Sequence, residues 1–552
     1  MLTPYRALSE YLPERNPALT GNLPVEPKRL KAWIETLPRA NQDSLLQSLA
    51  EAVQQIRNRR MEGFARFEAL EMLRPVLLET LALVSGRLQG STFPLSGQKA
   101  MLAEQIMTLQ RDLAHAYRMA VIDACPGGKA PFLRGGQVTQ VLVRAVYHAS
   151  RHIFASYFLY RQPEPGAWGG INALLRFARS IGLHEKSVEE PVEKGTATVM
   201  SLYVQALLLS LTNPYCFNQR ELSELWTLTR DLAPGVELSP QRFGPTGSVA
   251  LIEMDLPPTY HTRAPDAASG AVLWIDLRDV RKRVLDALER PLEGEIAINL
   301  GRGNDLIVSE SVMRQAFNNW EQAASRTYPR IPADHMIEAV IGLSGVHYHL
   351  AGRVDFDSLL RDLQGVEPSF DDRVGWAAAA ADSSRMRATI LARAMDQSLG
   401  GYRLRWDNSE AVRARIGEVI GLSVPYDSGE RNWMVGIVRW LRYDGSAMDA
   451  GIDLVGHRAR AISVRLLDGP SHRPPQRAIE FADPLENVGD TGLRLLVPSV
   501  FATEDGGRIE ISRPPDAADF DETGSQVYLC TPSGVEESTG EYFVLSASAQ
   551  TA

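Results

Sequence analysis

The sequence has little of what marks a secreted, disulfide-bonded or zinc-binding protein. It contains three cysteines in 552 residues, Cys125, Cys216 and Cys530, and none of them forms a CxxC pair. An odd number of widely spaced cysteines indicates reduced thiols rather than a disulfide framework. The first residues of the chain also lack the apolar core of a signal peptide. We therefore expect a cytoplasmic location.

Long apolar runs and an excess of positive charge are absent too. The longest apolar run, 199–211, is shorter than the roughly 20 residues that a membrane helix needs, so it predicts a buried helix. The formal net charge of −9 argues against binding a nucleic-acid polymer or an anionic membrane surface. We expect neither kind of partner and no membrane insertion. A local basic patch could still bind one small anion.

Motifs of common enzymes are missing as well. The sequence has no P-loop, no dinucleotide-binding glycine motif, no HExxH and no GxSxG. His347 and His349 would share one face of a strand and could hold a metal ion there. No acidic or thiol partner lies near them in sequence, which favours packed or hydrogen-bonded histidines. We expect a protein that is not an enzyme and has no metal site or cofactor.

The chain is longer than one ordinary domain, and its composition, 44% hydrophobic and 23% charged, is that of a globular protein. Apolar periodicity and turn residues divide it into five parts and predict a multidomain α+β fold. The parts are an extended segment at 1–26, a helical scaffold at 27–235, a small α/β module at 240–322, an antiparallel β-barrel at 323–468 and an all-β module at 476–552.

The helical scaffold is predicted from apolar residues that recur every three or four positions. Leu45, Leu49, Val53 and Ile56 show this spacing, which places them on one buried helix face. Successive segments of this kind, joined by short Gly/Pro turns, indicate a helical bundle or a solenoid of helix pairs. Such a scaffold either offers a surface to a protein partner or only stabilises the rest of the chain.

The barrel is predicted from strand-like runs with turn signals between them. The run 433–443 predicts a long strand, and 450–455 predicts its hairpin partner after a turn at Asp444 and Gly445. We expect the first barrel strand within 336–350, followed by an insertion at about 351–384 that contains a short helix.

Two short stretches carry the candidate site. In the first, Arg326 and Arg330 lie four residues apart, and Pro329 and Pro332 favour extended backbone around Arg330. A guanidinium carries a planar fork of donors and can bind phosphate oxygens or the O6/N7 edge of guanine. Two of them on one linker could therefore close on a compact dianionic dinucleotide. Taken alone, the pair is equally typical of a solvated surface.

The second stretch runs from Asp396 through Ser398 to Gly400 and Gly401. On a strand, Asp396 and Ser398 would share one face. The carboxylate could accept hydrogen bonds from guanine, and the hydroxyl could donate one. The two glycines permit positive φ and close approach of a ligand. Taken alone, this stretch is an ordinary hairpin turn.

Together these stretches resemble the RxxxR and (D/N)xSxxG signatures of the PilZ domain, a bacterial receptor for cyclic di-GMP. Val438-Arg439-Trp440 and Gly451-Ile452 also stand at the usual places, and the resemblance covers about 325–465. It implies a small antiparallel barrel that binds cyclic di-GMP through Arg326, Arg330, Asp396, Ser398, Gly400 and Gly401.

The resemblance implies a bacterial second-messenger receptor in which ligand binding rearranges the flanking domains. It further suggests a protein partner for the helical part, with motility, adhesion or biofilm control as output. The alternative is an interaction scaffold whose barrel no longer binds the ligand. A hydrolase acting on a nucleotide is a third hypothesis. Glu68-Ala69-Leu70 spells the name of the EAL phosphodiesterases. That tripeptide lies within a predicted helix and lacks the other acidic ligands in order.

Overall fold

Two compact units make up the protein: Met1–Ser91 with Leu95–Ser325, and Thr92–Pro94 with Arg326–Ala552. The computed structural model confirms the α+β multidomain class. It describes residues 3–190, 195–244, 247–265, 272–291, 294–300, 305–321, 329–364, 388–407, 412–424, 432–456, 459–467, 474–481, 492–498, 501, 508–514, 526–539 and 542–549.

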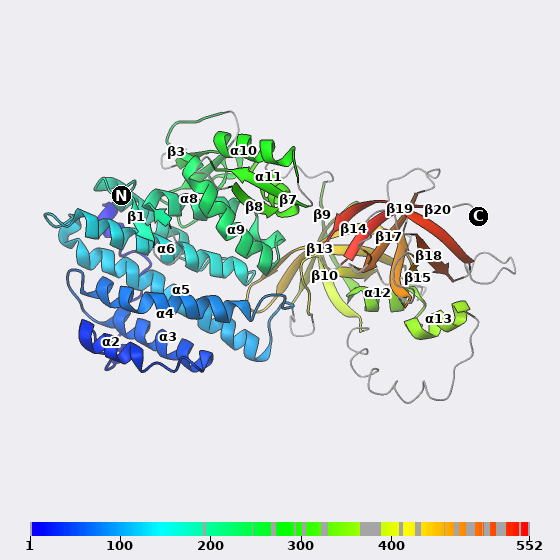
Figure 1. Cartoon of the computed structure of the whole chain (residues 1–552), viewed down its shortest axis with the longest axis horizontal. Helices are drawn as coiled ribbons and strands as arrows, with labels where there is room; N and C mark the ends of the chain where they lie inside the picture. The colour runs from blue at the N-terminus through cyan, green and yellow to red at the C-terminus, as the bar shows by residue number, and fades with distance from the viewer. Residues whose placement is uncertain are drawn as a thin grey trace. The chain divides into compact units, whose positions relative to one another are not determined.

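The first unit is mainly helical, as the apolar periodicity predicted (Figure 1, blue to green). Several helix starts are capped by side chains that satisfy the first backbone N–H groups, for example Asn218 and Glu221 at the start of α9. The principal helices are α2 (Pro27–Glu35), α3 (Gln42–Asn58), α4 (Ala65–Gly86), α5 (Gly97–Ala124), α6 (Gly135–Phe158), α7 (Ala167–Ser180), α8 (Val199–Leu211) and α9 (Gln219–Leu232).

Helix α6 lies at the centre of this unit. It packs against α5, α7 and α8, and almost all of its side chains beyond Val138 are buried. A short hairpin of β1 (Val188–Glu190) and β2 (Gly195–Ala197) follows α7. At the N-terminus, the segment expected to be extended contains one short α-helix, α1 (Pro4–Ala7), which packs on α7, and a 3-10 helix, Pro17–Leu19, which packs on α3.

The α/β elements of the first unit follow the helices. They are a four-stranded sheet in the order β3-β6-β4-β5 and a hairpin of β7 with β8, together with two helices. Trp320 and Asn319 donate hydrogen bonds to carbonyls of Leu208 and Thr212, which ties the last helix to the end of α8. The elements are β3 (Glu237–Ser239), β4 (Ser248–Leu251), β5 (Thr259–Tyr260), β6 (Val272–Asp276), α10 (Arg278–Leu288), β7 (Glu295–Asn299), β8 (Asp305–Ser309) and α11 (Glu310–Glu321).

The second unit contains the expected antiparallel barrel, which is closed in the order β10-β11-β14-β13-β12-β9. Its interior is lined by apolar residues such as Ala394, Leu404 and Val438, all almost completely buried. The strands are β9 (Ile331–Ile341), β10 (Ile390–Ser398), β11 (Gly401–Trp406), β12 (Val419–Ser423), β13 (Trp433–Tyr443) and β14 (Met448–Gly456).

The expectation of a first strand within 336–350 was wrong in its second half. The strand β9 ends at Ile341, because Gly342 has a φ of 89° and turns the chain into helix α12 (Leu343–Leu350). The paired histidines therefore lie on a helix. Burial lowers the pKa of His347 to about 4, and its Nε2 lies 3.1 Å from the carbonyl oxygen of Ile462.

His349 packs its ring against Trp433, with ring centroids 4.7 Å apart. Both histidines are thus packed side chains, as the sequence favoured. Within the part of the chain that the structure describes, no cluster of metal-ligating side chains is present. Helix α13 (Phe356–Gln364) is the short helix expected in the insertion, and residues 365–387 lie outside the described ranges.

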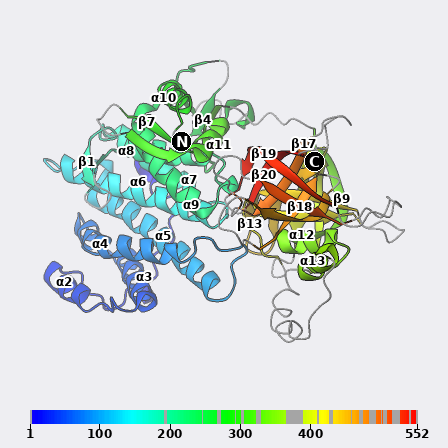
Figure 2. The ribbon, with the colours of Figure 1, turned by 45° about the vertical axis from the view of Figure 1, so that its right-hand side comes forward.

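The C-terminal β module is a second closed barrel, in the order β15-β16-β17-β20-β19-β18. It begins at Ala459, earlier than the expected 476. Figures 1 and 2 show its strands in orange to red. They are β15 (Ala459–Leu466), β16 (Gln476–Phe481), β17 (Gly492–Pro498), β18 (Ile509–Arg513), β19 (Gln526–Ser538) and β20 (Tyr542–Ala549).

The two barrels share a core. Val340, Val346, Trp433 and Val455 from the first barrel and α12 belong to the same buried cluster as Phe481 and its neighbours from the second. Helix α12 packs against strands of both barrels. The second unit is therefore one body with two barrels, and α12 lies in its common core.

Two further expectations concern the whole chain. Among the helices that the structure describes, none is long and apolar enough to cross a membrane. Cys125, Cys216 and Cys530 form no disulfide bond.

Candidate functional site

The two motifs meet at the start of β9 and the end of β10. Arg330 stands immediately before β9, and β10 runs antiparallel to β9 so that Asp396 is opposite Pro332. The Nη1 of Arg330 donates a hydrogen bond to Oδ1 of Asp396, forming an ion pair. Both side chains are about one quarter exposed, so the pair is accessible from solvent. Residues 66 positions apart in sequence thus make one surface of the barrel.

A β-bulge aims Asp396 at that surface. Ala394 pairs with Leu404, and both point into the barrel and are completely buried. With regular alternation, Asp396 would share the inner face with Ala394. The register shifts between Ala394 and Asp396, however, so that Asp396 pairs with Arg403. The extra residue, Met395, therefore puts the carboxylate on the outer face, beside the arginine.

Ser398 and the two glycines form the turn between β10 and β11. Ser398 pairs with Gly401, and its Oγ is 3.4 Å from the Gly401 carbonyl oxygen. The Gly400 carbonyl accepts a hydrogen bond from the Leu454 N–H of β14 at 2.9 Å. The turn is thus held on both sides, and it keeps Ser398 next to Asp396 at the end of the barrel.

Gly401 is required for a reason other than positive φ. Its φ is ordinary, but a Cβ there would lie 2.0 Å from the Ile452 carbonyl oxygen of the neighbouring strand. Gly451 is constrained in a similar way, because a Cβ there would lie 1.8 Å from Nε1 of Trp440. The Trp440 indole therefore lies against the backbone of β14 at Gly451, directly across from Arg403 in the register.

Further charged residues lie on this face that the sequence did not mark as site residues. Arg403 donates to Asp449 at 2.8 Å, and Arg405 donates to the same carboxylate at 3.2 Å. Arg439 pairs with Asp453 at 2.8 Å. The signal for Arg403 and Arg405 was present in the sequence, since arginines two apart on the strand after the DxSxxG turn must share a face.

Arg326, the first arginine of the RxxxR pair, lies outside the described residues. Of the six expected site residues, the structure thus places Arg330, Asp396, Ser398, Gly400 and Gly401 at one end of one barrel. The face offers guanidinium donors, carboxylate acceptors and an aromatic ring. These groups are suited to phosphate oxygens, to the edge of a purine and to its flat face respectively.

A six-stranded antiparallel barrel with Arg330 and the DxSxxG stretch together at one end defines a PilZ-domain protein. Residues 28–242 match the family described as "Cyclic-di-GMP receptor FimW, N-terminal domain". Residues 249–388 and 367–461 match "Cyclic-di-GMP receptor FimW, middle PilZ domain". Together these matches cover well over half of the chain, which therefore belongs to the FimW family of multidomain PilZ proteins.

One curated relative aligns over most of the chain. The cyclic-di-GMP receptor FimW of Pseudomonas aeruginosa is 24% identical over 491 residues, which is 80% of this chain and 79% of the relative. The alignment is long enough to include both the helical part and the barrel.

Proposed function

We propose that this protein is a receptor for cyclic di-GMP and binds the dinucleotide at the end of its first barrel. The residues are Arg326, Arg330, Asp396, Ser398, Gly400 and Gly401. The contact between Arg330 and Asp396 carries the proposal, because it joins the two motifs on one accessible surface. The name of the Pseudomonas aeruginosa relative gives the same ligand.

The chemistry of each group suggests its part in binding. Arg326 and Arg330 supply charged donors to the phosphates or to guanine O6 and N7. A carboxylate can accept several hydrogen bonds, so Asp396 can bind a guanine N–H while Arg330 still holds it. Trp440 and the guanidinium of Arg403 offer flat surfaces on which a guanine can stack.

We further propose that binding is coupled to the arrangement of the two units. The main part of the second unit begins at Arg326, so the linker that carries both arginines is also one of the places where the chain passes between the units. Fixing those arginines on a ligand restricts the linker. The helical unit would then present a changed surface to a protein partner, with motility, adhesion or biofilm control as the output.

An alternative function is an interaction scaffold that binds no nucleotide. The observation in its favour is the same ion pair, since Arg330 and Asp396 already satisfy each other's charge without a ligand. In that case the pair would only hold the end of β10 against the start of β9.

Isothermal titration of the full chain with cyclic di-GMP separates these two functions. Arg330→Ala should weaken binding by roughly tenfold to a hundredfold, since a charged hydrogen bond contributes about 1.5–3 kcal/mol. Arg465→Ala is the control, because Arg465 also forms an ion pair, with Glu510 on the second barrel, although its side chain is more exposed, at 44% against 25% for Arg330. The control should bind as the wild type does.

Two results would contradict the receptor proposal. One is the absence of any heat or thermal shift with cyclic di-GMP, which favours the scaffold. The other is an unchanged affinity in Arg330→Ala, which would move the binding site elsewhere.

A further inference from the structure

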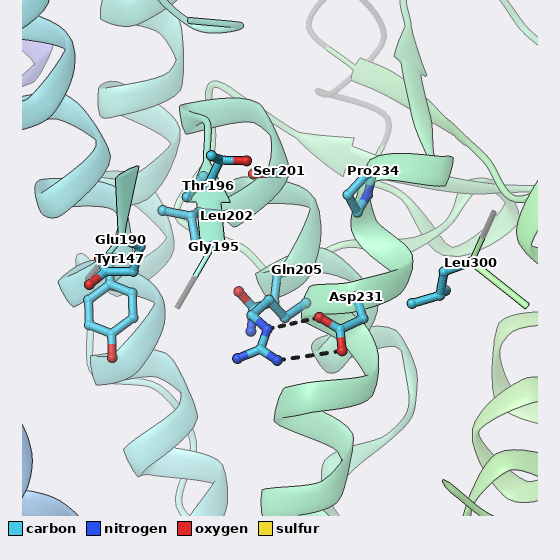
Figure 3. Close-up of a pocket in the computed structure, with 12 residues that line it drawn as sticks. Tyr147, Glu190, Gly195, Thr196, Ser201, Leu202, Gln205, Asp231, Pro234 and Leu300 are labelled. Carbon is cyan, nitrogen blue, oxygen red and sulfur yellow. Dashed lines mark hydrogen bonds and ion pairs between the residues drawn. The ribbon is translucent and has the colours of Figure 1, made fainter. Parts of the chain in front are cut away.

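Two cavities of the helical unit differ in how their charges are balanced. One, of about 140 Å³, is lined by the β1–β2 hairpin and helices α8 and α9 (Figure 3). Its charged groups are paired. Arg230 donates to Asp231 at 3.0 Å, and Glu190 accepts hydrogen bonds from Arg74 and Arg144. A charged ligand would have to displace these pairs, so this cavity is not suited to one.

The second cavity, of about 120 Å³, lies between α5, α6 and the start of α7. Three basic side chains of α5 line it, namely Arg111, His115 and Arg118. Their spacing of four and three residues places them on one face of the helix. Helix α6 adds His152 to the same cavity. Its volume is several times the ~30 Å³ share of one water molecule in the liquid.

Arg118 is the exceptional residue of this cavity. It is 4% exposed, and its Nε and Nη2 atoms have no hydrogen-bond partner among the described residues. The acid that acts on it electrostatically is Asp255, whose carboxylate already accepts from the backbone N–H groups of Gly166 and Gly169. Burial lowers the pKa of Arg118 to about 10. A buried guanidinium without a partner is costly, which points to a missing anion.

A glycine of α7 leaves space for this guanidinium. Gly170 faces it from α7, and a Cβ on Gly170 would lie 1.9 Å from the Nη1 of Arg118. Only glycine leaves that space. Helix α7 therefore leaves space for Arg118 in an orientation in which its Nε and Nη2 make no hydrogen bond to a described residue.

The two histidines extend the same pattern. Within the described residues, Nδ1 of His115 and Nε2 of His152 make no hydrogen bond. Burial, followed by neighbouring cations such as Arg118 and Arg111, lowers the pKa of His115 to about 3 and that of His152 to about 4. Both rings are thus neutral at pH 7, and each can take up a proton if negative charge is placed beside it.

The acids around the cavity do not balance its bases closely. Asp112 is 3.6 Å from Arg57, and Glu164 is 3.5 Å from Arg111 and 3.7 Å from Nε2 of His152, all longer than a hydrogen-bonded ion pair. Arg118 forms no ion pair with any described residue. The positive charge of this cavity is therefore concentrated on the buried guanidinium of Arg118, which forms no ion pair with the described acids.

We propose that this cavity is a second ligand site, which binds a small dianionic oxoanion such as phosphate or the phosphoryl group of a phosphomonoester. Arg118 supplies two charged donors from Nε and Nη2. His115 and His152 supply further donors after taking up protons. The site lies wholly within the helical unit and shares no residue with the barrel face, so it stands or falls independently of cyclic di-GMP binding.

Sulfate is the first probe, because it stays dianionic over the pH range in which histidine titrates. The full chain is melted and titrated with sulfate at constant ionic strength, with chloride as the reference salt. We expect sulfate to raise the melting temperature of the wild type, as a ligand that binds only the folded state must. Arg118→Gln should bind sulfate roughly tenfold to a hundredfold more weakly.

The control variant is Arg29→Gln. It removes one positive charge from the exposed face of α2, far from this cavity in sequence, and should keep the wild-type sulfate response. Gly170→Ala is a second variant in case Arg118→Gln folds poorly. It favours the helix and displaces the guanidinium without removing it, so it should also weaken sulfate binding.

A pH series tests the histidines. We expect sulfate affinity to rise as the pH falls from about 8 to about 5.5, because bound dianion raises the pKa of each imidazole and protons are taken up. The charged groups that face the two rings are Arg57, Arg111, Arg118, Asp112 and Glu164. A pH-independent affinity would overturn the part assigned to His115 and His152.

Phosphate and guanosine monophosphate are compared last. If only phosphate binds, the ligand of this cavity is the free ion. If the nucleotide binds more tightly than phosphate, the ligand is a phosphomonoester. The proposal is overturned if sulfate stabilises the wild type no more than chloride does, or if Arg118→Gln and the wild type bind sulfate equally.

Discussion

The two barrels have one topology and different surfaces. If the strands of each are numbered in chain order, both close in the cyclic order 1-2-3-6-5-4. The chain segments that lead into the two barrels differ. The first is preceded by a linker with two arginines, whereas only residues 457–458 separate the second from β14. Two residues leave no room for an RxxxR motif. Strand order alone therefore does not distinguish the two barrels, but the linker that precedes each of them does.

Glycine use differs in the same way. In the first barrel, Gly401, Gly436 and Gly451 each face atoms closer than 3.0 Å to where a Cβ would stand. In the second, Gly534 faces nothing within 4 Å. Close packing of backbone against backbone and indole is thus confined, among these strand glycines, to the barrel that carries the motifs. It fixes the positions of the groups on its outer face.

The largest difference in stability between the barrels is expected when one glycine of each is replaced by alanine. Gly401→Ala should lower the free energy of unfolding by about 3 kcal/mol, the upper end for overpacking, because the Ile452 carbonyl blocks the new methyl group. Gly534→Ala should change it by less than about 0.5 kcal/mol. Chemical denaturation of both variants measures this. Equal effects would mean that the barrels are packed alike.

The pH dependence of stability tests the junction of the barrels at His347. Its ring is neutral in the folded protein, with a pKa of about 4, and takes up a proton in the unfolded chain below about pH 6.5. Stability should therefore fall as the pH falls from about 6.5 to about 4, by on the order of 3 kcal/mol from this group.

Denaturation of the wild type and His347→Gln at several pH values measures that share. The variant should lose less stability across this window than the wild type does. Parallel curves for the two proteins would show that His347 of α12 is not held neutral by its packing against β15.

A smaller effect is expected from Asp396→Asn. The change removes the charge partner of Arg330 and an acceptor for guanine, so cyclic di-GMP should bind roughly tenfold more weakly. Glu510→Gln, the matched change at the Arg465 pair of the second barrel, should leave binding unaltered. Titration calorimetry compares them. A loss in both variants would point to general electrostatics rather than to a site.

Much of this architecture could be predicted from periodicity and turn chemistry. The helices from α2 to α9 followed from apolar spacing, and β13 and β14 from alternation around a turn. The second half of the run at 336–350 was misassigned because a short apolar stretch fits a buried helix as well as a strand. Its correct reading depended on Gly342, whose left-handed φ is set by tertiary structure.

The candidate site was predicted in part. Arg330, Asp396 and Ser398 were found through their motifs, but their common face depends on the bulge at Met395, which no local pattern announces. The role of Gly401 was attributed to positive φ and to close approach of a ligand, whereas the structure shows an ordinary φ and a contact with a strand some fifty residues later in the chain. Arg118 gave no signal in sequence, because its lack of a partner is a property of the packed helices.

The segment Thr92–Pro94 belongs to the barrel unit although its flanking residues belong to the helical one. Phe93 is buried there and exchanges two backbone hydrogen bonds with Ala414, at 2.8 and 2.9 Å. A C-terminal fragment that starts at Arg326 would therefore lack a piece of its own fold and expose the Ala414 backbone. Any dissection of this protein into halves has to supply that tripeptide to the barrels, or keep the chain whole.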